Sequence, residues 1–296
     1  MQDIKRIMKI AYLILAHSDP EGLRRLAKKL IGHADVYIHI NAKNNISPFI
    51  EKLDTLKYCG HKVYFASKRE KVSWAGYSIV KAAMGLLKDA LKKDSYDRIT
   101  LITGQDYPIV DEKRLLDFYE KHRNIIFVTG TQCTSEKEES LMLLENRDIR
   151  IFHILLKLFV HPIQLRFKPF QRRDYVSLEG VRYPVYGISP KWSITGDAAR
   201  HLVSFYDKNK SFNRFFRTRH APDDYYVATV LFNSEYRERI DNKTHFFWTV
   251  FLPNNGGTKI LDEADIDSIK RSGAIFVRKM DSKKSNALYS LIENLQ

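Results

Sequence analysis

Three clusters of residues in this chain have the types and spacing that chemistry requires. The first runs from Thr103 to Pro108, where Gly104, Gln105 and Asp106 directly follow an apolar run. A glycine followed by polar side chains at the end of a strand lets the backbone approach a ligand closely. A plain turn between a strand and a helix has the same composition, and the spacing alone favours neither interpretation.

The second cluster is a pair of adjacent acids, Asp223 and Asp224, which follow Pro222 at the start of a predicted helix that runs to Leu231. A carboxylate can act as a general base. Adjacent helical residues point about 100° apart, so only one of the two acids can face a cleft. The alternative is that both acids simply complement the helix dipole.

The third cluster is Arg278 and Lys279, at the end of the apolar run that begins at Ala274. Two fixed cations at a strand end could hold a diphosphate. They could also be surface residues whose stems lie on the protein while their charges stay in water.

Motifs for metal and nucleotide binding are otherwise missing from the sequence. The chain has no glycine-rich phosphate loop, no HExxH string and no metal-ligand spacing among its ten histidines. Its one DxD string, Asp265 to Asp267, falls at a predicted helix start, where acids are favoured by the dipole. We therefore expect neither a metal-dependent nucleotide-sugar site nor any other cofactor.

A regular alternation of elements must position these clusters. Continuous apolar runs predict buried strands, and three- and four-residue apolar spacing predicts helices between them. The predicted strands cover residues 10–16, 36–40, 62–65, 98–102 and 125–129, and the predicted helices cover 20–30, 78–91 and 111–122. This order predicts an α/β fold with a Rossmann-like, mostly parallel sheet covered by helices.

Ligands in such folds bind beyond the carboxyl ends of the strands. Here those ends are His17, Asn41, residues 66–67 and residues 103–106. The second half is less regular, with helices predicted over 195–206 and 222–231, and a final strand from Ala274. Because no linker or repeat interrupts the chain, we expect one domain over residues 1–296.

Composition narrows the class of protein. The 49 Lys and Arg against 35 Asp and Glu give a net charge of +14, which suits nucleic acid, an anionic membrane or a phosphorylated small molecule. An ordinary basic surface would explain the charge equally well. A hydrophobic fraction of 44% excludes a disordered chain, and two cysteines exclude a disulfide scaffold. With no signal peptide or membrane-spanning stretch in the sequence, we expect a cytoplasmic protein.

Taken together, the motifs resemble the core 2/I-branching β-1,6-N-acetylglucosaminyltransferases and their xylosyltransferase relatives, which form glycosyltransferase family 14. The resemblance runs in order from about Ala11 to Leu291. It is carried by KVSWAGYS at 71–78, TGQDYPI at 103–109, GISPKWSIT at 187–195, APDDYYVAT at 221–229 and AIFVRKM at 274–280.

The resemblance implies a GT-A type fold and an inverting, metal-independent transfer from a UDP-sugar. It assigns the general base to Asp224 and the diphosphate contact to Lys279, with Lys259 as the nearest basic partner upstream. The acid that contacts uridine in the family falls at Asn41 here, which is a departure from the pattern. Residues 1–130 are then the nucleotide-sugar-binding half, and residues 131–296 the acceptor-binding and catalytic half.

The chemistry agrees with this assignment. An inverting transfer needs one carboxylate to take the acceptor proton, and the departing UDP needs its new charge stabilised. Without a metal-binding DxD motif, fixed cations must do this, and Arg278, Lys279 and Lys259 are available. The further donor-binding candidates are His17, Asn41, Trp74, Gly104, Gln105 and Asp106. At the acceptor we expect Asp223 and Trp192, although a core tryptophan is the alternative for Trp192.

We therefore expect a glycosyltransferase of bacterial surface polysaccharide synthesis that moves N-acetylglucosamine, or alternatively xylose or galactose, to a saccharide or lipid-linked acceptor. The competing hypothesis is a basic nucleic-acid-binding module. Such a module would carry aromatic residues on an exposed strand face beside Lys and Arg, whereas the aromatic residues of this chain lie mostly within apolar runs. We expect no nucleic-acid partner. In residues 147–173 cations border an apolar stripe, which is typical of contact with an anionic membrane, or else of a core helix.

Overall fold

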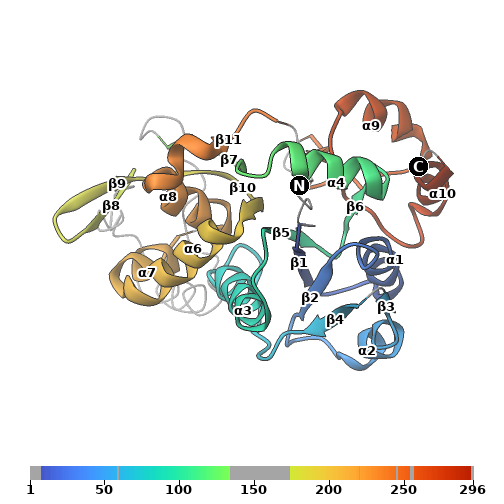
Figure 1. Cartoon of the computed structure of the whole chain (residues 1–296), viewed down its shortest axis with the longest axis horizontal. Helices are drawn as coiled ribbons and strands as arrows, with labels where there is room; N and C mark the ends of the chain where they lie inside the picture. The colour runs from blue at the N-terminus through green and yellow to red at the C-terminus, as the bar shows by residue number, and fades with distance from the viewer. Residues whose placement is uncertain are drawn as a thin grey trace, which may run out of the picture.

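The computed structural model describes residues 8–58, 60–133, 174–219, 221–244, 246–253 and 257–294. Its centre is an eight-stranded sheet in the order β11-β7-β10-β5-β1-β2-β4-β3 (Figure 1). The strands are β1 (Ile10–Ala16), β2 (Asp35–Ile40), β3 (Lys57–Tyr58), β4 (His61–Phe65), β5 (Arg98–Thr103), β7 (Ile126–Gln132), β10 (Tyr186–Thr195) and β11 (Ile240–Asp241). Both halves of the chain contribute strands, so the sheet belongs to a single domain.

The pairing of the strands is largely parallel. β1 pairs in parallel with β2 and β5, β2 pairs in parallel with β4, and β11 pairs in parallel with β7. The exception at the centre is β10, which lies antiparallel between β5 and β7. The predicted α/β class with a mostly parallel sheet is therefore confirmed, and β10 is a central strand that the sequence pattern does not indicate.

Helices cover both faces of the sheet. Alternate residues of β1 point to opposite faces, so Tyr12 and Ile14 belong to one hydrophobic core while Ala11 and Leu13 belong to another. Helices α1 (Pro20–Leu30), α2 (Ser47–Leu53), α4 (Glu112–Lys121), α9 (Ile266–Ser272) and α10 (Asn286–Asn294) pack in the first core. Helices α3 (Ser78–Lys93), α6 (Gly196–Lys208), α7 (Lys210–Arg217) and α8 (Tyr226–Phe232) pack in the second. Figure 1 shows α4 and α3 on opposite sides of β1 and β5.

The helix starts follow from local sequence. The Asp19 side chain accepts a hydrogen bond from the Gly22 backbone N–H at 2.9 Å, and Pro20 occupies the first position of α1. In the same way Asp111 accepts from the Arg114 N–H at 2.6 Å and starts α4. These helices begin where the sequence predicts because their capping residues satisfy otherwise unpaired backbone donors.

A second, three-stranded sheet joins two of the chemical clusters. Its central strand β13 (Phe276–Arg278) pairs with β12 (Phe247–Thr249) and with β6 (Asp106–Pro108). In the antiparallel pair Arg278 lies opposite Asp106. The segment after Thr103 is therefore a turn at Gly104 and Gln105 followed by a short strand, rather than a turn that leads directly into a helix. A separate hairpin consists of β8 (Tyr175–Leu178) and β9 (Val181–Pro184).

The helix predicted from Pro222 is interrupted. Residues Pro222–Asp224 form a 3-10 turn, η1, and the α-helix starts only at Tyr226. This corrects the predicted continuous helix, because the two acids sit in a tight turn ahead of α8. Two further 3-10 turns are η2 (Glu235–Arg239) and η3 (Glu263–Asp265).

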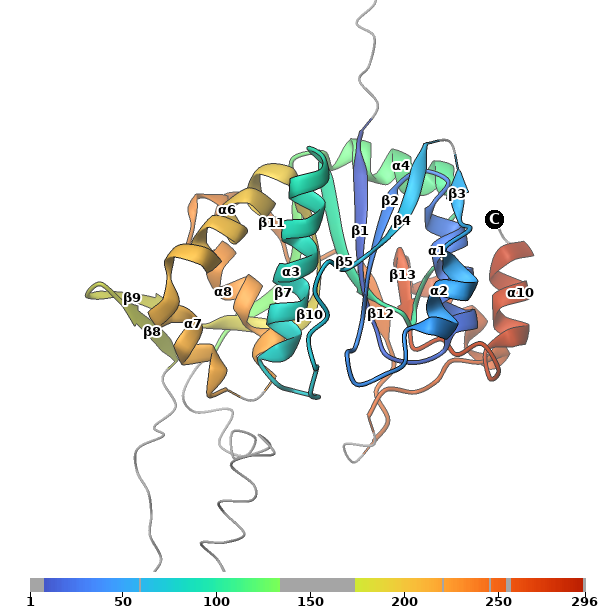
Figure 2. The same ribbon diagram turned by 90° about the horizontal axis from the view of Figure 1, so that it is seen from below.

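The described residues include no helix that is both long and apolar enough to span a bilayer. The basic stretch 147–173 lies outside them. Figure 2 shows the molecule from a second direction, with α3 and α6 to the left of β1 and α1 and α2 to its right.

Candidate active site

The two acids of η1 are held against β10 by a glycine. A Cβ atom at Gly187 would lie 2.4 Å from the backbone oxygen of Asp224 and 2.5 Å from a ring carbon of Tyr225. No side chain fits at that distance, so Gly187 is what allows the turn to pack this closely. We call residues Pro222–Tyr225 the carboxylate turn.

Burial controls the electrostatics of the carboxylate turn. Desolvation and, as the smaller cause, the neighbouring Asp223 together raise the pKa of Asp224 to about 7. Burial also raises the pKa of Asp223 to about 6, and Oδ1 of that residue is buried without a hydrogen-bond partner. No described cation forms an ion pair with either acid. A carboxylate with these properties can take up a proton near neutral pH.

A cluster of cations lies where the ends of β5 and β13 meet Lys191 in the middle of β10. Its centre is the fully buried carboxylate of Asp106, whose Oδ2 accepts hydrogen bonds from the Thr103 N–H at 2.6 Å and the Thr103 hydroxyl at 3.0 Å. The other oxygen, Oδ1, lies 3.5 Å from Nη1 of Arg278 and 3.6 Å from Nζ of Lys191. Arg278 also donates to the Thr103 hydroxyl.

Lys279 and His17 border the same cluster. Burial lowers the pKa of His17, and the positive charges of Lys279 and Arg278 lower it further. We call Asp106, Lys191, Arg278 and Lys279 the cation cluster. It carries three positive charges against one carboxylate, and this excess favours an anionic ligand.

Backbone contacts fix the two segments that carry the cluster. The Gln105 carbonyl accepts a hydrogen bond from the Met280 N–H at 2.8 Å, and the Lys279 carbonyl accepts one from the Leu261 N–H at 2.9 Å. A Cβ at Gly104 would lie 2.9 Å from Cβ of Ala16, so this glycine allows close packing against the end of β1. The structure thus gives Gly104 and Gln105 a role in holding the cluster together.

Lys259 has a carboxylate partner of its own. Its Nζ lies 2.8 Å from both carboxylate oxygens of Asp265, and this hydrogen bonding raises the pKa of Lys259. Asp265 also takes part in the capping box that starts η3. The prediction that the DxD string marks a helix start is confirmed. Lys259 therefore has a carboxylate within hydrogen-bond distance, whereas Arg278 lies 3.5 Å from the carboxylate of Asp106.

Asn41 uses its side chain to hold a neighbouring segment. Its amide donates to the Val72 carbonyl at 2.9 Å and accepts from the Val72 N–H at 3.0 Å. The following Ala75 carbonyl accepts a hydrogen bond from the Ala221 N–H at 2.9 Å. The segment between them therefore connects the end of β2 to the carboxylate turn, and it carries Trp74, which is 76% exposed.

The expectation for Trp192 is wrong. Its side chain is only 1% exposed and packs in the core beneath α3 and α6, so it cannot stack on an acceptor sugar. Its position in a strand that is covered by helices explains the burial. Trp74, in contrast, presents an aromatic surface to solvent.

Lys191 is the residue of the site that the sequence analysis missed. It is a lone lysine inside GISPKWSIT, and its charged side chain is only 8% exposed. The signal that could have identified it is a cation within a segment that is otherwise apolar or small. Among the residues that the structure describes, no group of three histidine, cysteine or acidic side chains converges as a metal site.

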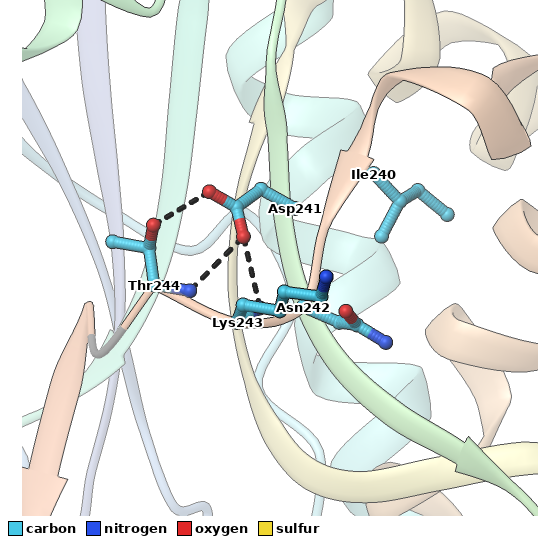
Figure 3. A pocket seen from close by; sticks show the side chains of 5 residues that line it. All are labelled: Ile240, Asp241, Asn242, Lys243 and Thr244. Atoms are coloured by element: carbon cyan, nitrogen blue, oxygen red, sulfur yellow. Dashed lines mark hydrogen bonds between the residues drawn. The ribbon is translucent and has the colours of Figure 1, made fainter.

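A pocket elsewhere is lined by residues 240–244, at the end of the edge strand β11 (Figure 3). There Asp241 accepts hydrogen bonds from the Lys243 N–H at 2.8 Å, the Thr244 N–H at 3.0 Å and the Thr244 hydroxyl at 2.5 Å. The carboxylate is used to stabilise its own turn. None of the predicted site residues lines this pocket.

Comparison with known proteins identifies relatives of the chain. The family model described as Core-2/I-Branching enzyme matches residues 10–168. The β-1,3-galactosyl-O-glycosyl-glycoprotein β-1,6-N-acetylglucosaminyltransferase 4 of Mus musculus is 24% identical over 93% of this chain and 62% of its own length. The probable enzyme 7 of the same description from Sus scrofa is 26% identical over 39% of this chain and 27% of its own length.

These matches span between about a quarter and three fifths of the relatives' own lengths. Among solved structures, the bifunctional glycosyltransferase WbbM in its apo form aligns over 94% of this chain and 46% of its own, with 11% identity and a TM-score of 0.39.

Proposed function

This chain belongs to the core-2/I-branching enzyme family, and from that membership we propose that it is a glycosyltransferase that moves a sugar from UDP to a saccharide hydroxyl. We propose N-acetylglucosamine as the sugar, by analogy with the activity that the names of its relatives state. One observation carries the proposal. A carboxylate with a raised pKa packs against Gly187 of β10, and Lys191 of the same strand belongs to a cation cluster with more positive than negative charge.

The carboxylate turn supplies the proton acceptor. In an inverting transfer the acceptor oxygen attacks the anomeric carbon, a new carbon–oxygen bond forms, and the bond from that carbon to the diphosphate oxygen breaks. Asp224 takes the proton from the acceptor hydroxyl as this occurs. Its pKa of about 7 makes it a stronger base than an exposed carboxylate, while it is still ionised in part at neutral pH. The adjacent Asp223 helps to keep the pKa of Asp224 high. We propose that Asp223 also contacts the acceptor sugar.

The cation cluster stabilises the leaving group. UDP departs with an additional negative charge on its diphosphate, and Arg278 and Lys279 lie where fixed cations would stabilise that charge as it develops. They would do so without a metal ion. His17, Gly104 and Gln105 line the same end of the sheet, and Trp74 would stack on a sugar face.

A donor other than UDP-N-acetylglucosamine is the second candidate within the same reaction, with UDP-xylose and UDP-galactose as the alternatives. Nucleic-acid binding is disfavoured by the placement of the aromatic residues. Most of the large aromatic side chains that the structure describes are buried in the two cores, where they cannot stack on bases.

The acceptor and the cellular location belong to the proposal as well. We propose a saccharide acceptor, free or lipid-linked, used in surface polysaccharide synthesis at the cytoplasmic face of the membrane, with residues 147–173 contacting anionic lipid. Sedimentation with vesicles tests the last point. Binding should require anionic lipid, decrease with salt, and weaken when Arg172 and Arg173 are replaced by serine. Equal recovery in the supernatant with anionic and neutral vesicles would contradict it.

Release of UDP from a panel of UDP-sugars, with and without EDTA, tests the proposed function. We expect turnover with one donor that persists in EDTA, and turnover lowered at least about a hundredfold in the Asp224→Asn variant. Loss of activity in EDTA would exclude the metal-independent mechanism. Thermal stabilisation by UDP, but not by oligonucleotides, would distinguish a transferase from a nucleic-acid-binding protein.

A further inference from the structure

The ammonium group of Lys191 is buried, and burial disfavours its charged form. It lies on β10 in a stretch where the register with β7 shifts between Ile188 and Trp192. Its Nζ lies 3.3 Å from the Thr249 hydroxyl and 4.7 Å from the centre of the Phe247 ring. Burying an ammonium group costs several kcal/mol unless an opposite charge compensates for it.

The compensating charge is shared. Asp106 Oδ1 lies 3.6 Å from Lys191 and 3.5 Å from Arg278, and it accepts no hydrogen bond. Both distances exceed the 2.7–2.9 Å that is usual for a charge-assisted hydrogen bond. Burial lowers the pKa of Lys191 and Arg278 lowers it further, although Asp106 acts in the opposite direction. One carboxylate thus stands between two cations and is fully paired with neither.

The two cations differ in what else they can reach. Arg278 is 24% exposed in its side chain and lies beside Lys279, at the edge of the cluster that we assign to the donor diphosphate. Lys191 is enclosed by Asp106, Thr249 and Phe247. Of the two, only Arg278 is exposed enough to turn toward a ligand, and Lys191 would then remain as the partner of Asp106.

From this geometry, and resting on the proposed function, we propose that Lys191 is a positioning residue that keeps Asp106 neutralised when Arg278 moves to the donor diphosphate. In the free protein Asp106 is shared between the two cations. In the complex with donor, Lys191 holds it alone. Without Lys191, any movement of Arg278 would leave a buried carboxylate unpaired, so Asp106 would retain Arg278 and compete with the diphosphate.

Calorimetric titration with UDP tests the proposal. Lys191→Met keeps the length and apolar stem of the side chain and removes its charge. We expect this variant to bind UDP about tenfold more weakly, the usual effect of losing one hydrogen bond to a charged group. Replacing Asp106 by asparagine as well should restore the affinity to within about threefold of wild type, because Arg278 then has no competing carboxylate.

The matched control is Lys88→Met, since Lys88 forms an ion pair with Asp207 at 2.5 Å on α3 and α6, away from the cluster. UDP affinity should not change in that variant. Wild-type protein that binds no UDP would contradict the proposed function instead, which is a separate outcome.

Three results would overturn the role of Lys191. The first is unchanged UDP affinity in Lys191→Met. The second is a loss that Asp106→Asn does not restore, because Lys191 would then contact the diphosphate directly. The third result applies if Lys191→Met fails to fold, in which case the UDP affinity of the double variant is compared with that of Asp106→Asn alone. Equal UDP affinity of those two variants supports the proposal, and weaker binding by the double variant overturns it.

Discussion

The carboxylate turn and the cation cluster surround their carboxylates with opposite electrostatic environments. Asp223 and Asp224 are adjacent and partly buried, and no described cation pairs with them, so desolvation raises the pKa of both. Asp106 is buried more completely, yet two cations and two hydrogen bonds from Thr103 surround it. Burial alone therefore does not determine what a carboxylate does. Its neighbours decide whether it can accept a proton or only serve as a counter-ion.

One strand joins the two regions. Gly187 of β10 allows the carboxylate turn to pack closely, and Lys191, four residues later, reaches the cation cluster. Those residues span roughly 13 Å of extended strand. The same strand also inserts between β5 and β7, which connects the site to the centre of the sheet. A change in β10 can thus affect either region separately, and the comparison can be tested residue by residue.

The largest effect is expected at the proton acceptor. Asp224→Asn should lower turnover between about a hundredfold and ten-thousandfold, because the amide cannot take the acceptor proton. UDP affinity, measured by calorimetry, should not change, since the cation cluster remains intact. In wild type, kcat/KM should rise with pH through about 7 as Asp224 loses its proton.

Asp223→Asn is the matched control for this position, because it removes the adjacent charge but leaves the proposed base. If Asp223→Asn abolishes turnover and Asp224→Asn does not, the base is the other acid of the turn. A pH profile that is flat between 5 and 8 would contradict the assignment of Asp224.

The next effect concerns the cation cluster. Lys279→Ala should weaken UDP binding and turnover together, by about 2–4 kcal/mol in transition-state terms, if its ammonium stabilises the leaving diphosphate. Lys259→Ala should cost less, because Lys259 is already paired with Asp265. Unchanged UDP affinity in Lys279→Ala would remove Lys279 from the site, and a larger loss in Lys259→Ala would reverse the order of the two lysines.

The third effect separates the regions through β10. Gly187→Ala places a methyl group against the backbone of Asp224, so the carboxylate turn must shift. We expect a loss of about 1–3 kcal/mol in unfolding free energy and reduced turnover, with UDP affinity retained. Urea unfolding and calorimetry measure the two quantities separately.

Gly85→Ala on α3 provides the control, because nothing lies within 4 Å of an added Cβ there. It should be neutral or stabilising, as expected for alanine inside a helix. A loss of UDP affinity in Gly187→Ala would show that the two regions are not independent.

The sequence predicts the first half of the fold well and the site only in part. Strands such as β1 and helices such as α3 follow from hydrophobic periodicity, which depends on local residues. β10 was missed because a glycine, a proline and a lysine interrupt its pattern. β6 is three residues long and forms only because β13 pairs with it from far along the chain. Long-range pairing of this kind leaves no local signal.

The lack of a local signal for long-range contacts also accounts for the errors in predicting the site from the sequence. Lys191 is buried because Asp106, 85 positions earlier, lies opposite it in the folded chain, and no window of the sequence contains both. Trp192 was expected at the acceptor because aromatic planes suit sugars, but helices from two other segments cover it. Asp224 was identified from a motif, and its raised pKa depends on burial that only the fold produces.

The smallest effect concerns stability and its dependence on pH. The folded-state pKa of Asp223 is about 6, above the ordinary value of 3.8, so the folded protein holds this proton more tightly than the unfolded chain. Stability should therefore fall as pH rises from about 4 to about 6. Asp223→Asn removes this cost and should raise the unfolding free energy at pH 8 by about 1–2 kcal/mol, with little change at pH 4.

Asp241 provides a control of opposite sign. Burial acts to raise its pKa, but hydrogen bonds from Thr244 and Lys243 outweigh this and lower it (Figure 3). Asp241 therefore contributes stability that is present above the unfolded pKa and is lost as pH falls. Asp241→Asn should lower the unfolding free energy at pH 8, where Asp223→Asn raises it. Urea titrations of both variants at pH 4 and pH 8 measure the difference. If Asp223→Asn lowers the unfolding free energy at pH 8, the charge of Asp223 stabilises the folded protein. The contrast between the carboxylate turn and the cation cluster would then be contradicted.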